Sequence, residues 1–182
     1  MNPKRDSLGR PYYTEAIHPR KKNGRVLKNG NHVNLRLVHY GASHYYPKEF
    51  NPISDVPFRN KPRGGLWSSP VGSSFGWREW CEAEQYGDLK KSFDFDFVGS
   101  VLKIDSVADM ESLPWIECNG SHFISFQALC APGFSYDAIH LTERGQQETR
   151  FSFPKSLYGW DCECVLVLNP KSISFKKIMR KK

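Results

Sequence analysis

The sequence has no long apolar run and no cysteine framework. No stretch of hydrophobic residues reaches the roughly 18 that a helix needs to cross a bilayer, so we expect no membrane span. The basic N-terminal region has no apolar core, and we therefore expect no secretory signal. The five cysteines are odd in number and lack framework spacing, which favours reduced thiols and a cytoplasmic location.

Signatures of several enzyme classes are also missing. Cys162 and Cys164 have no second cysteine pair at zinc-like spacing, and the histidines show no E-x-x-H pattern. The sequence contains no G-x-x-x-x-G-K-S/T loop for phosphates and no G-x-S-x-G turn around its paired serines. We therefore predict no metal site, and we interpret the two cysteines as small residues of a buried strand.

Positive charge is concentrated at the two ends of the chain. Residues 1–30 hold eight basic and two acidic residues, and residues 171–182 hold six basic and no acidic ones. Because the net charge of the 182-residue chain is +7, residues 31–170 carry a charge of −5. We interpret residues 1–30 as a basic arm and residues 31–182 as one domain with a basic tail. Such ends serve either to bind RNA or DNA phosphates or only to keep the protein soluble.

The hydrophobic pattern predicts more strands than helices. Alternating or continuous apolar residues predict strands at 33–40, 65–69, 93–97, 101–105, 136–142 and 162–168. Pro70 should end the second of these, because proline has no N–H for the strand ladder. Residues 43–63, with four prolines, are expected to be mostly loop.

Two short helices are expected between these strands. Ser73 or Ser74 would cap a helix over residues 75–86 that is buried through a stripe of Trp77, Trp80 and Cys81. Ser106 and Asp109 have the spacing of a capping box at the start of a helix that ends near residue 113. Strands interrupted by short helices predict an α+β fold with an antiparallel or mixed sheet.

Three separated segments combine the residue types of a nucleotide site. They are Leu37-Val38-His39-Tyr40-Gly41, Lys61-Pro62-Arg63-Gly64-Gly65-Leu66-Trp67-Ser68-Ser69 and Trp160-Asp161-Cys162-Glu163. Paired glycines allow a close approach to the backbone, and an adjacent aromatic side chain can face a flat ring. Each segment alone also fits a structural role: a histidine at a strand end, a tight turn beside a core aromatic, or a carboxylate at a sheet end.

In this order the segments resemble the ADP-ribosyltransferase superfamily, particularly its diphtheria-toxin-like and poly(ADP-ribose) polymerase-like branch. That branch has a histidine–glycine strand, a glycine-rich strand with an aromatic residue before a helix, and an acidic residue on a late strand. Residues 136–139 resemble the strand before the last element, and Glu163–Pro170 resembles the acidic strand with its closing Asn-Pro turn. The resemblance covers roughly residues 33–175 and implies the split antiparallel or mixed sheet of that superfamily, with short helices.

The resemblance implies a site for NAD. The residues in contact with NAD would be His39, Tyr40, Gly41, Trp67, Ser68 and Ser69. The histidine would hydrogen-bond a ribose hydroxyl, and the tyrosine backbone would hold the nicotinamide amide. The tryptophan would stack on the nicotinamide ring where relatives have a tyrosine, and a serine would help to hold the carboxamide.

The acidic strand offers two candidates for the catalytic carboxylate. Asp161 and Glu163 share one face if the strand is regular. Counting back from Asn169-Pro170 places the family's acidic position at Cys164. Either a bulge realigns Glu163 or the catalytic role belongs to Asp161, and we favour Glu163. A further departure is Tyr40, which stands between the histidine and the glycine where some relatives have the two adjacent.

These residue types suit the chemistry of NAD cleavage. Breaking the bond from ribose to nicotinamide builds positive charge on the sugar, as in glycoside hydrolysis, and a nearby carboxylate stabilises that charge more than it stabilises the ground state. The sequence therefore predicts a mono-ADP-ribosyltransferase that passes ADP-ribose to a macromolecular acceptor, either protein or RNA/DNA. If water attacks instead, the protein is an NAD glycohydrolase.

Two other interpretations stay open at this point. One is a non-catalytic nucleic-acid-binding module that uses the basic termini, and the other is a relative that binds nucleotides without reacting. By analogy with the fold alone, a transferase of this size would be a toxin or effector, with a neutralising antitoxin or inhibitor as a further partner.

Overall fold

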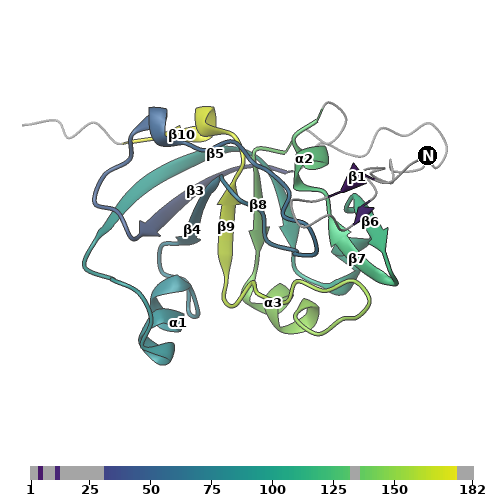
Figure 1. The fold of residues 1–182 in the computed structure, drawn as a ribbon. Coiled ribbons are helices and arrows are strands. Elements are labelled where there is room, and N and C mark those ends of the chain that lie inside the picture. The colour runs from purple at the N-terminus through teal and green to yellow at the C-terminus, as the bar shows by residue number, and fades with distance from the viewer. Residues whose placement is uncertain (1–3, 6–10, 13–30, 132–135, 176–182) are drawn as a thin grey trace, which may run out of the picture.

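The computed structural model of the chain describes residues 4–5, 11–12, 31–131 and 136–175 (Figure 1). Most of the basic arm and the end of the basic tail, residues 176–182, lie outside the described residues, so their roles stay predictions. The described part consists mainly of β-sheet with few, short helices. The predicted α+β class with a mixed sheet is confirmed.

A six-stranded sheet forms the centre of the molecule (Figure 1). Its order is β10-β5-β3-β4-β9-β8, and the neighbours in this order are antiparallel. The last four residues of β5 also pair in parallel with β8, which makes the sheet mixed. The strands are β3 (Asn31–Tyr40), β4 (Leu66–Pro70), β5 (Ser92–Ile104), β8 (Ala138–Leu141), β9 (Cys164–Val167) and β10 (Ile173–Ser174).

Strand β9 is buried on both of its faces, as expected for a short, continuously apolar strand in the middle of a sheet. Val165 and Val167 belong to one hydrophobic cluster, with Leu37 of β3. Cys164 and Leu166 belong to a second cluster, which continues through β8 and the end of β5. The prediction of a buried strand is confirmed for Cys164, whereas Cys162 precedes the strand, which is shorter than residues 162–168.

Strand β5 shows how alternation sets the two faces of the sheet. Phe95 and Phe97 are fully buried, whereas Asp94 and Asp96 point to the other face, 3.5 and 3.2 Å from the guanidinium of Arg36. The prediction of a one-sided strand at 93–97 is confirmed.

The prediction of a separate strand at 101–105 is wrong, because β5 runs without a break through Gly99. A side chain at Gly99 would lie 2.6 Å from Oδ2 of Asp137. That carboxylate accepts a hydrogen bond from the N–H of Ser100 at 2.8 Å. The glycine therefore lets a loop carboxylate approach the backbone instead of ending the strand.

Helix α1 (Trp77–Glu84) starts later than predicted, and neither predicted serine caps it. The carboxylate of Glu79 accepts from the N–H of Gly76 at 2.9 Å, and Oγ of Ser69 accepts from the N–H of Trp77 at 2.8 Å. The hydroxyls of Ser73 and Ser74 donate instead to carboxylates outside the helix. Within the expected stripe only Cys81 is buried, while the two tryptophans are half-buried and stacked on each other.

The remaining elements of the described chain are short. They are β1 (Lys4–Arg5), β2 (Pro11–Tyr12), η1 (Pro47–Glu49), η2 (Val107–Ser112), β6 (Trp115–Cys118), β7 (Ser121–Ile124), α2 (Phe126–Leu129), α3 (Glu143–Thr149) and η3 (Pro170–Ser172). The predicted capping carboxylate of η2 is confirmed, because Asp109 accepts from the N–H of Ser106 at 2.8 Å. Helices α1 and α3 lie at the same end of the sheet, below the strands in Figure 1. No helix in the described ranges is both long and apolar enough to cross a membrane.

Gly145 of α3 tests how closely this helix packs on the sheet. Alanine normally stabilises a helix interior by about 1 kcal/mol relative to glycine. Here an added Cβ would lie 2.1 Å from the carbonyl oxygen of Ile104 in β5. We therefore expect Gly145→Ala to lower the free energy of unfolding in urea by about 1–3 kcal/mol. Glu148→Ala on the exposed side of α3 is the control and should change it by less than about 0.5 kcal/mol. A more stable Gly145→Ala protein would contradict the close packing.

Candidate functional site

The three segments singled out in the sequence form neighbouring strands. Strand β3 pairs with β4 through Leu37–Pro70 and Val38–Ser69, and β4 pairs with β9 from Leu66–Val167 to Ser68–Val165. The third segment leads directly into β9. The sheet therefore brings together residues that the sequence separates by about a hundred positions.

A cavity of about 240 Å³ opens where these three segments meet, and we call it the tryptophan cavity. Its lining consists of Val38, His39, Tyr40, Lys61, Trp67, Ser68, Trp77, Trp160, Asp161, Cys162 and Cys164. Five of the predicted site residues thus line one cavity: His39, Tyr40, Trp67, Ser68 and Asp161. Three other predicted site residues, Gly41, Ser69 and Glu163, do not line it.

Trp67 is held at this cavity by two neighbours. The ring of Trp160 lies 4.7 Å from it at 69°, an edge-to-face arrangement. Trp160 is itself buried and donates its indole N–H to the carbonyl oxygen of Asn60. The ammonium of Lys61 lies 5.2 Å from the centre of the Trp67 ring and donates to the carbonyl of Gly159 at 3.2 Å. A flat ligand that reaches this indole must therefore share the site with an ammonium group.

His39 is oriented by the backbone of the next strand. Its Nδ1 lies 2.7 Å from the carbonyl oxygen of Trp67, and its ring lies 5.1 Å from that of Phe93. A carbonyl oxygen can only accept a hydrogen bond, so Nδ1 carries the proton and Nε2 of the neutral ring is an acceptor. Gly41 follows with φ +106°, which favours glycine, and donates its N–H to the carbonyl of Lys91 at 2.8 Å.

Asp161 lies in the tryptophan cavity but is already paired. Its Oδ1 lies 2.9 Å from Nη1 of Arg150, and both side chains are largely shielded from solvent. Burial raises the pKa of the Cys162 thiol to about 12 and raises the pKa of Cys164 well above its ordinary value, which disfavours the thiolate form that a nucleophile needs. The carboxylate of Asp161 is therefore engaged by the guanidinium of Arg150 at the edge of this cavity.

Glu163 points away from the tryptophan cavity into an open depression beside β8. Its Oε1 accepts a hydrogen bond from Nε2 of His140 at 2.8 Å, and its Oε2 accepts one from the hydroxyl of Ser73 at 2.6 Å. The hydrogen bond from His140 contributes most to holding the pKa of Glu163 below its ordinary value, and that from Ser73 acts in the same direction against the effect of burial. Glu163 is therefore ionised at neutral pH.

The two acidic residues separate because the chain is irregular just before β9. The strand begins at Cys164, and the N–H of Glu163 donates to the carbonyl of Phe75 at 3.0 Å instead of joining the ladder. The pairing of β4 with β9 shows no offset over its three registered pairs. Both carboxylates would share a face only if a regular strand began at residue 161. The strand begins at Cys164, so they do not.

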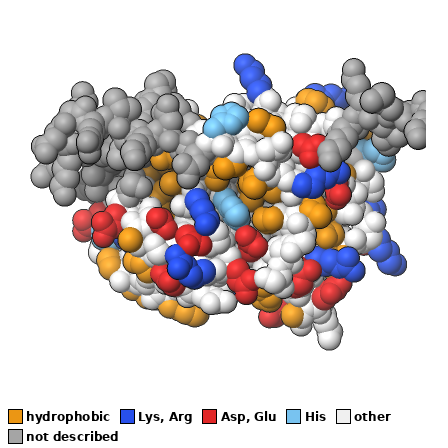
Figure 2. All heavy atoms as spheres, turned by 180° about the vertical axis from the view of Figure 1, so that it is seen from behind, with side chains coloured by type: hydrophobic (Ala, Val, Ile, Leu, Met, Phe, Trp, Pro, Cys, Tyr) orange, Lys and Arg blue, Asp and Glu red, His pale blue; other side chains and the backbone are white. Residues whose placement is uncertain are grey.

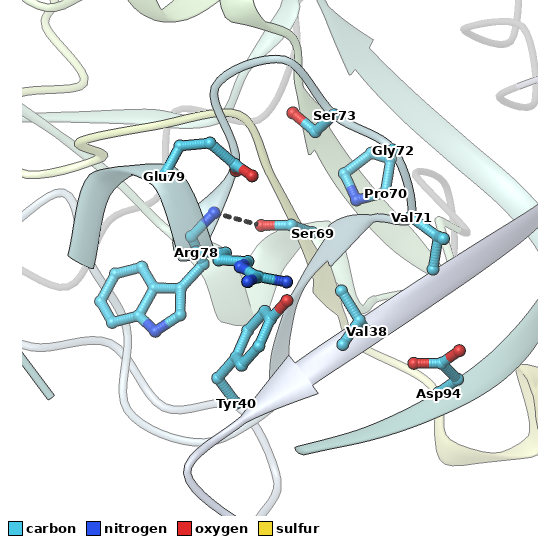
Figure 3. Close-up of a pocket in the computed structure, with 11 residues that line it drawn as sticks. Val38, Tyr40, Ser69, Pro70, Val71, Gly72, Ser73, Arg78, Glu79 and Asp94 are labelled. Carbon is cyan, nitrogen blue, oxygen red and sulfur yellow. Dashed lines mark hydrogen bonds between the residues drawn. The ribbon is translucent and has the colours of Figure 1, made fainter. Parts of the chain in front are cut away.

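A second cavity of about 270 Å³ adjoins the first beneath α1, and we call it the helix cavity (Figure 3). It shares Val38, Tyr40 and Trp77 with the tryptophan cavity. In Figure 3 the Tyr40 ring points from β3 toward the guanidinium of Arg78, and burial raises the pKa of the Tyr40 hydroxyl. The two cavities thus lie side by side between the tryptophans and the start of α1.

The helix cavity also approaches Glu163. Ser69 accepts from the N–H of Trp77 and donates to the carbonyl of Glu163 at 3.0 Å. Ser73, which lines the same cavity, donates to the Glu163 carboxylate. Two serine hydroxyls therefore connect the helix cavity to the second acidic residue.

Sequence reasoning did not identify His140, Ser73 or Lys61 as parts of the site. His140 alternates with buried neighbours on β8, and only its antiparallel pairing with β9 brings it near Glu163. Lys61 is the first residue of the glycine-rich segment 61–69, so its position in the sequence could have indicated a place in the site. Within the described residues, no group of three or more His, Cys, Asp or Glu side chains is placed to hold a metal ion.

The tryptophan cavity is small for a whole ligand. Sites for drug-sized molecules usually measure about 300–1,000 Å³, so about 240 Å³ fits a single flat ring with part of its substituent. The adjoining helix cavity offers room for the remainder of a longer molecule. Comparisons of the chain with protein-family models, with curated proteins and with solved structures gave no match.

Proposed function

We propose that the protein is a mono-ADP-ribosyltransferase that cleaves the nicotinamide–ribose bond of NAD. The observation that carries the proposal is the adjacency of the three motif strands, which gathers His39, Trp67 and Asp161 around one cavity. Residues 31–182 would form the catalytic domain, with a fold of the ADP-ribosyltransferase type. The five cysteines are free, which suits action in the cytoplasm.

In this proposal the tryptophan cavity receives the nicotinamide end of NAD. Its size fits one aromatic ring, and its lining supplies indole surfaces for that ring. With Nδ1 bonded to the Trp67 carbonyl, Nε2 of His39 is the ring nitrogen that would accept a hydrogen bond from a ribose hydroxyl. The rest of the dinucleotide would extend along the helix cavity, where Arg78 offers a guanidinium to a phosphate.

The proposal assigns different roles to the two carboxylates. The charge of Asp161 is balanced by Arg150, so it offers less stabilisation to a sugar that becomes positive. Glu163 is ionised, and its carboxylate is fixed by hydrogen bonds from His140 and Ser73. Fixed negative charge that meets positive charge only in the transition state is what raises a rate. Glu163 does not line the tryptophan cavity, so it is the preferred catalytic residue on the condition that the ribose lies toward the helix cavity, where Ser73 contacts its carboxylate. Asp161, which lines the tryptophan cavity, is the alternative.

The proposed reaction balances without a metal or a redox partner. The bond from ribose C1 to the nicotinamide nitrogen breaks, and its electron pair leaves with neutral nicotinamide. A nucleophilic atom of the acceptor forms the new bond to C1 and loses its proton to a carboxylate or to water. If water is the acceptor, the products are free ADP-ribose and nicotinamide.

The test is to incubate the protein with NAD labelled in the adenylate part, with and without cell extract. We expect free nicotinamide to appear and the label to enter macromolecules. Trp67→Leu keeps much of the apolar volume but removes the aromatic surface, and it should release less nicotinamide while keeping its circular dichroism spectrum. Nicotinamide release without labelled macromolecules would indicate a glycohydrolase. NAD binding without nicotinamide release would contradict the proposed catalysis.

A further inference from the structure

The three most exposed large hydrophobic side chains in the described part of the chain lie in one loop. Phe151, Phe153 and Tyr158 are 66%, 77% and 63% exposed, and they belong to residues 150–160 between α3 and β9. We call these residues the aromatic loop. Burying such rings in the core would normally be favourable, so their gathering on the surface points to a partner.

Cations accompany these rings. The guanidinium of Arg150 lies 5.7 Å from the ring of Phe151 and 5.5 Å from that of Tyr158, and these two rings are 6.0 Å apart. Lys155 is the second basic residue of the loop, which contains no acidic residue. Because Arg150 is paired with Asp161, Lys155 supplies the positive charge that accompanies the aromatic faces of the loop.

The loop is held in shape by its own hydrogen bonds. Ser156 donates its hydroxyl to the carbonyl of Arg150 at 2.8 Å, and Ser152 donates to that of Lys155 at 2.7 Å. The N–H of Leu157 donates to the carbonyl of Thr149 at 3.0 Å, and its side chain is buried in the core. A fixed frame keeps the rings exposed and lowers the entropy lost when a partner binds.

We propose that the aromatic loop binds single-stranded nucleic acid, with unpaired bases stacked on Phe151, Phe153 and Tyr158. Nucleic-acid sites without base pairing commonly combine stacking on aromatic or guanidinium planes with cations for the phosphates. The basic ends of the chain, each with a net charge of +6, would add attraction for a polyanion.

Charge favours this partner over a hydrophobic protein surface. On the face that Figure 2 shows, acidic and basic side chains are mixed. The aromatic loop itself contains two basic residues and no acidic one, and one of the two, Arg150, is paired with Asp161 just beyond the loop. Each nucleotide of a single strand carries one negative charge and one flat base. Single-stranded nucleic acid therefore matches both the basic residues and the aromatic rings of the loop.

The aromatic loop lies close to the site proposed for NAD, which relates nucleic-acid binding to the proposed function. Arg150 pairs with Asp161, and Trp160 at the end of the loop lines the tryptophan cavity. A base stacked on the loop would therefore lie next to the site proposed for NAD. Resting on the proposed function, the bound strand is the acceptor of ADP-ribose; the binding itself does not depend on that function.

The experiment measures binding of labelled oligothymidine and oligouridine to the full chain without NAD, by fluorescence anisotropy over a range of salt. We expect each of Phe151→Ala, Phe153→Ala and Tyr158→Ala to weaken binding at least about fivefold without changing the slope of log K against log salt. Lys155→Gln should instead lower the slope by about 0.7 for one lost phosphate contact. Tyr46→Ala, an exposed aromatic residue outside the loop, is the matched control and should bind as the wild type does.

Two results would overturn the inference. One is equal affinity for single strands in the wild type and in the variant lacking all three rings, since the basic ends alone would then explain binding. The other is loss of labelling of a protein, and not of nucleic acid, in the loop variants. Because no NAD is present in the binding assay, its result is independent of whether the protein cleaves NAD.

Discussion

Glu163→Gln is expected to lower nicotinamide release by about 10²–10³-fold, the usual cost of removing one electrostatic group that acts on the transition state. Glutamine keeps the size of the side chain, and its amide oxygen can still accept the hydrogen bond from His140. The negative charge that would face the developing positive sugar is lost. Release of nicotinamide from NAD at saturating concentration measures the effect, and the NAD affinity should change little.

Asp161→Asn is the matched control for this prediction. The change removes the charge that pairs with Arg150, so it should lower the stability modestly and leave nicotinamide release within about tenfold of the wild type. The opposite ranking of the two variants would transfer the catalytic role to Asp161, which is the carboxylate that lines the tryptophan cavity. Unchanged release in both variants would contradict the proposed mechanism as a whole.

The pH dependence gives an independent view of the same residue. The hydrogen bonds from His140 and Ser73 lower the pKa of Glu163, so its carboxylate stays ionised to lower pH than an ordinary glutamate does. Nicotinamide release should therefore stay level from neutral pH down to about pH 5. Ser73→Ala removes one of the two donors and should move the acid limb of the profile toward higher pH.

The strands were largely predictable from the sequence because alternation reports burial directly. The Phe-Asp repeat of β5 and the apolar run of β9 each indicated the correct element. The repeat gives no information about which distant residues contact the strand. The break expected before residue 101 was wrong because Asp137 occupies the space that Gly99 leaves open. A long-range contact, and not a local propensity, kept that strand continuous.

The candidate site was predictable only in part for a related reason. Residues 39 and 67 are placed by regular strands, so their order along the chain was enough to expect them together. Residues 161–163 precede the regular strand. The side chain of Asp161 is oriented by Arg150, and Glu163 is oriented by His140 and by the carbonyl of Phe75 just before α1. Hydrogen bonds between distant segments leave no local periodicity, so the split between Asp161 and Glu163 had no sequence signal.

Trp160→Ala should have the largest effect on stability among the residues of the site. Trp160 is 1% exposed, stacks on Phe126 at 6.2 Å and supports Trp67 edge-on. Removing a buried tryptophan costs about 3–5 kcal/mol through lost contacts and the remaining cavity. It also leaves the carbonyl of Asn60 without its indole donor. Since a whole domain is stable by only about 5–15 kcal/mol, unfolding in urea should begin at much lower concentration.

A second substitution at Trp160 distinguishes its effect on NAD binding from its effect on stability. Trp160→Phe keeps a ring against Trp67 but removes the indole N–H, so it should cost only part of the stability that the alanine variant loses. If Trp67 has to be held in place to receive nicotinamide, the affinity for NAD should fall in both variants at temperatures where both remain folded, and more in Trp160→Ala. A loss of stability below about 1 kcal/mol for the alanine variant would mean that Trp160 is not the anchor of this cavity, and unchanged NAD affinity would place nicotinamide elsewhere.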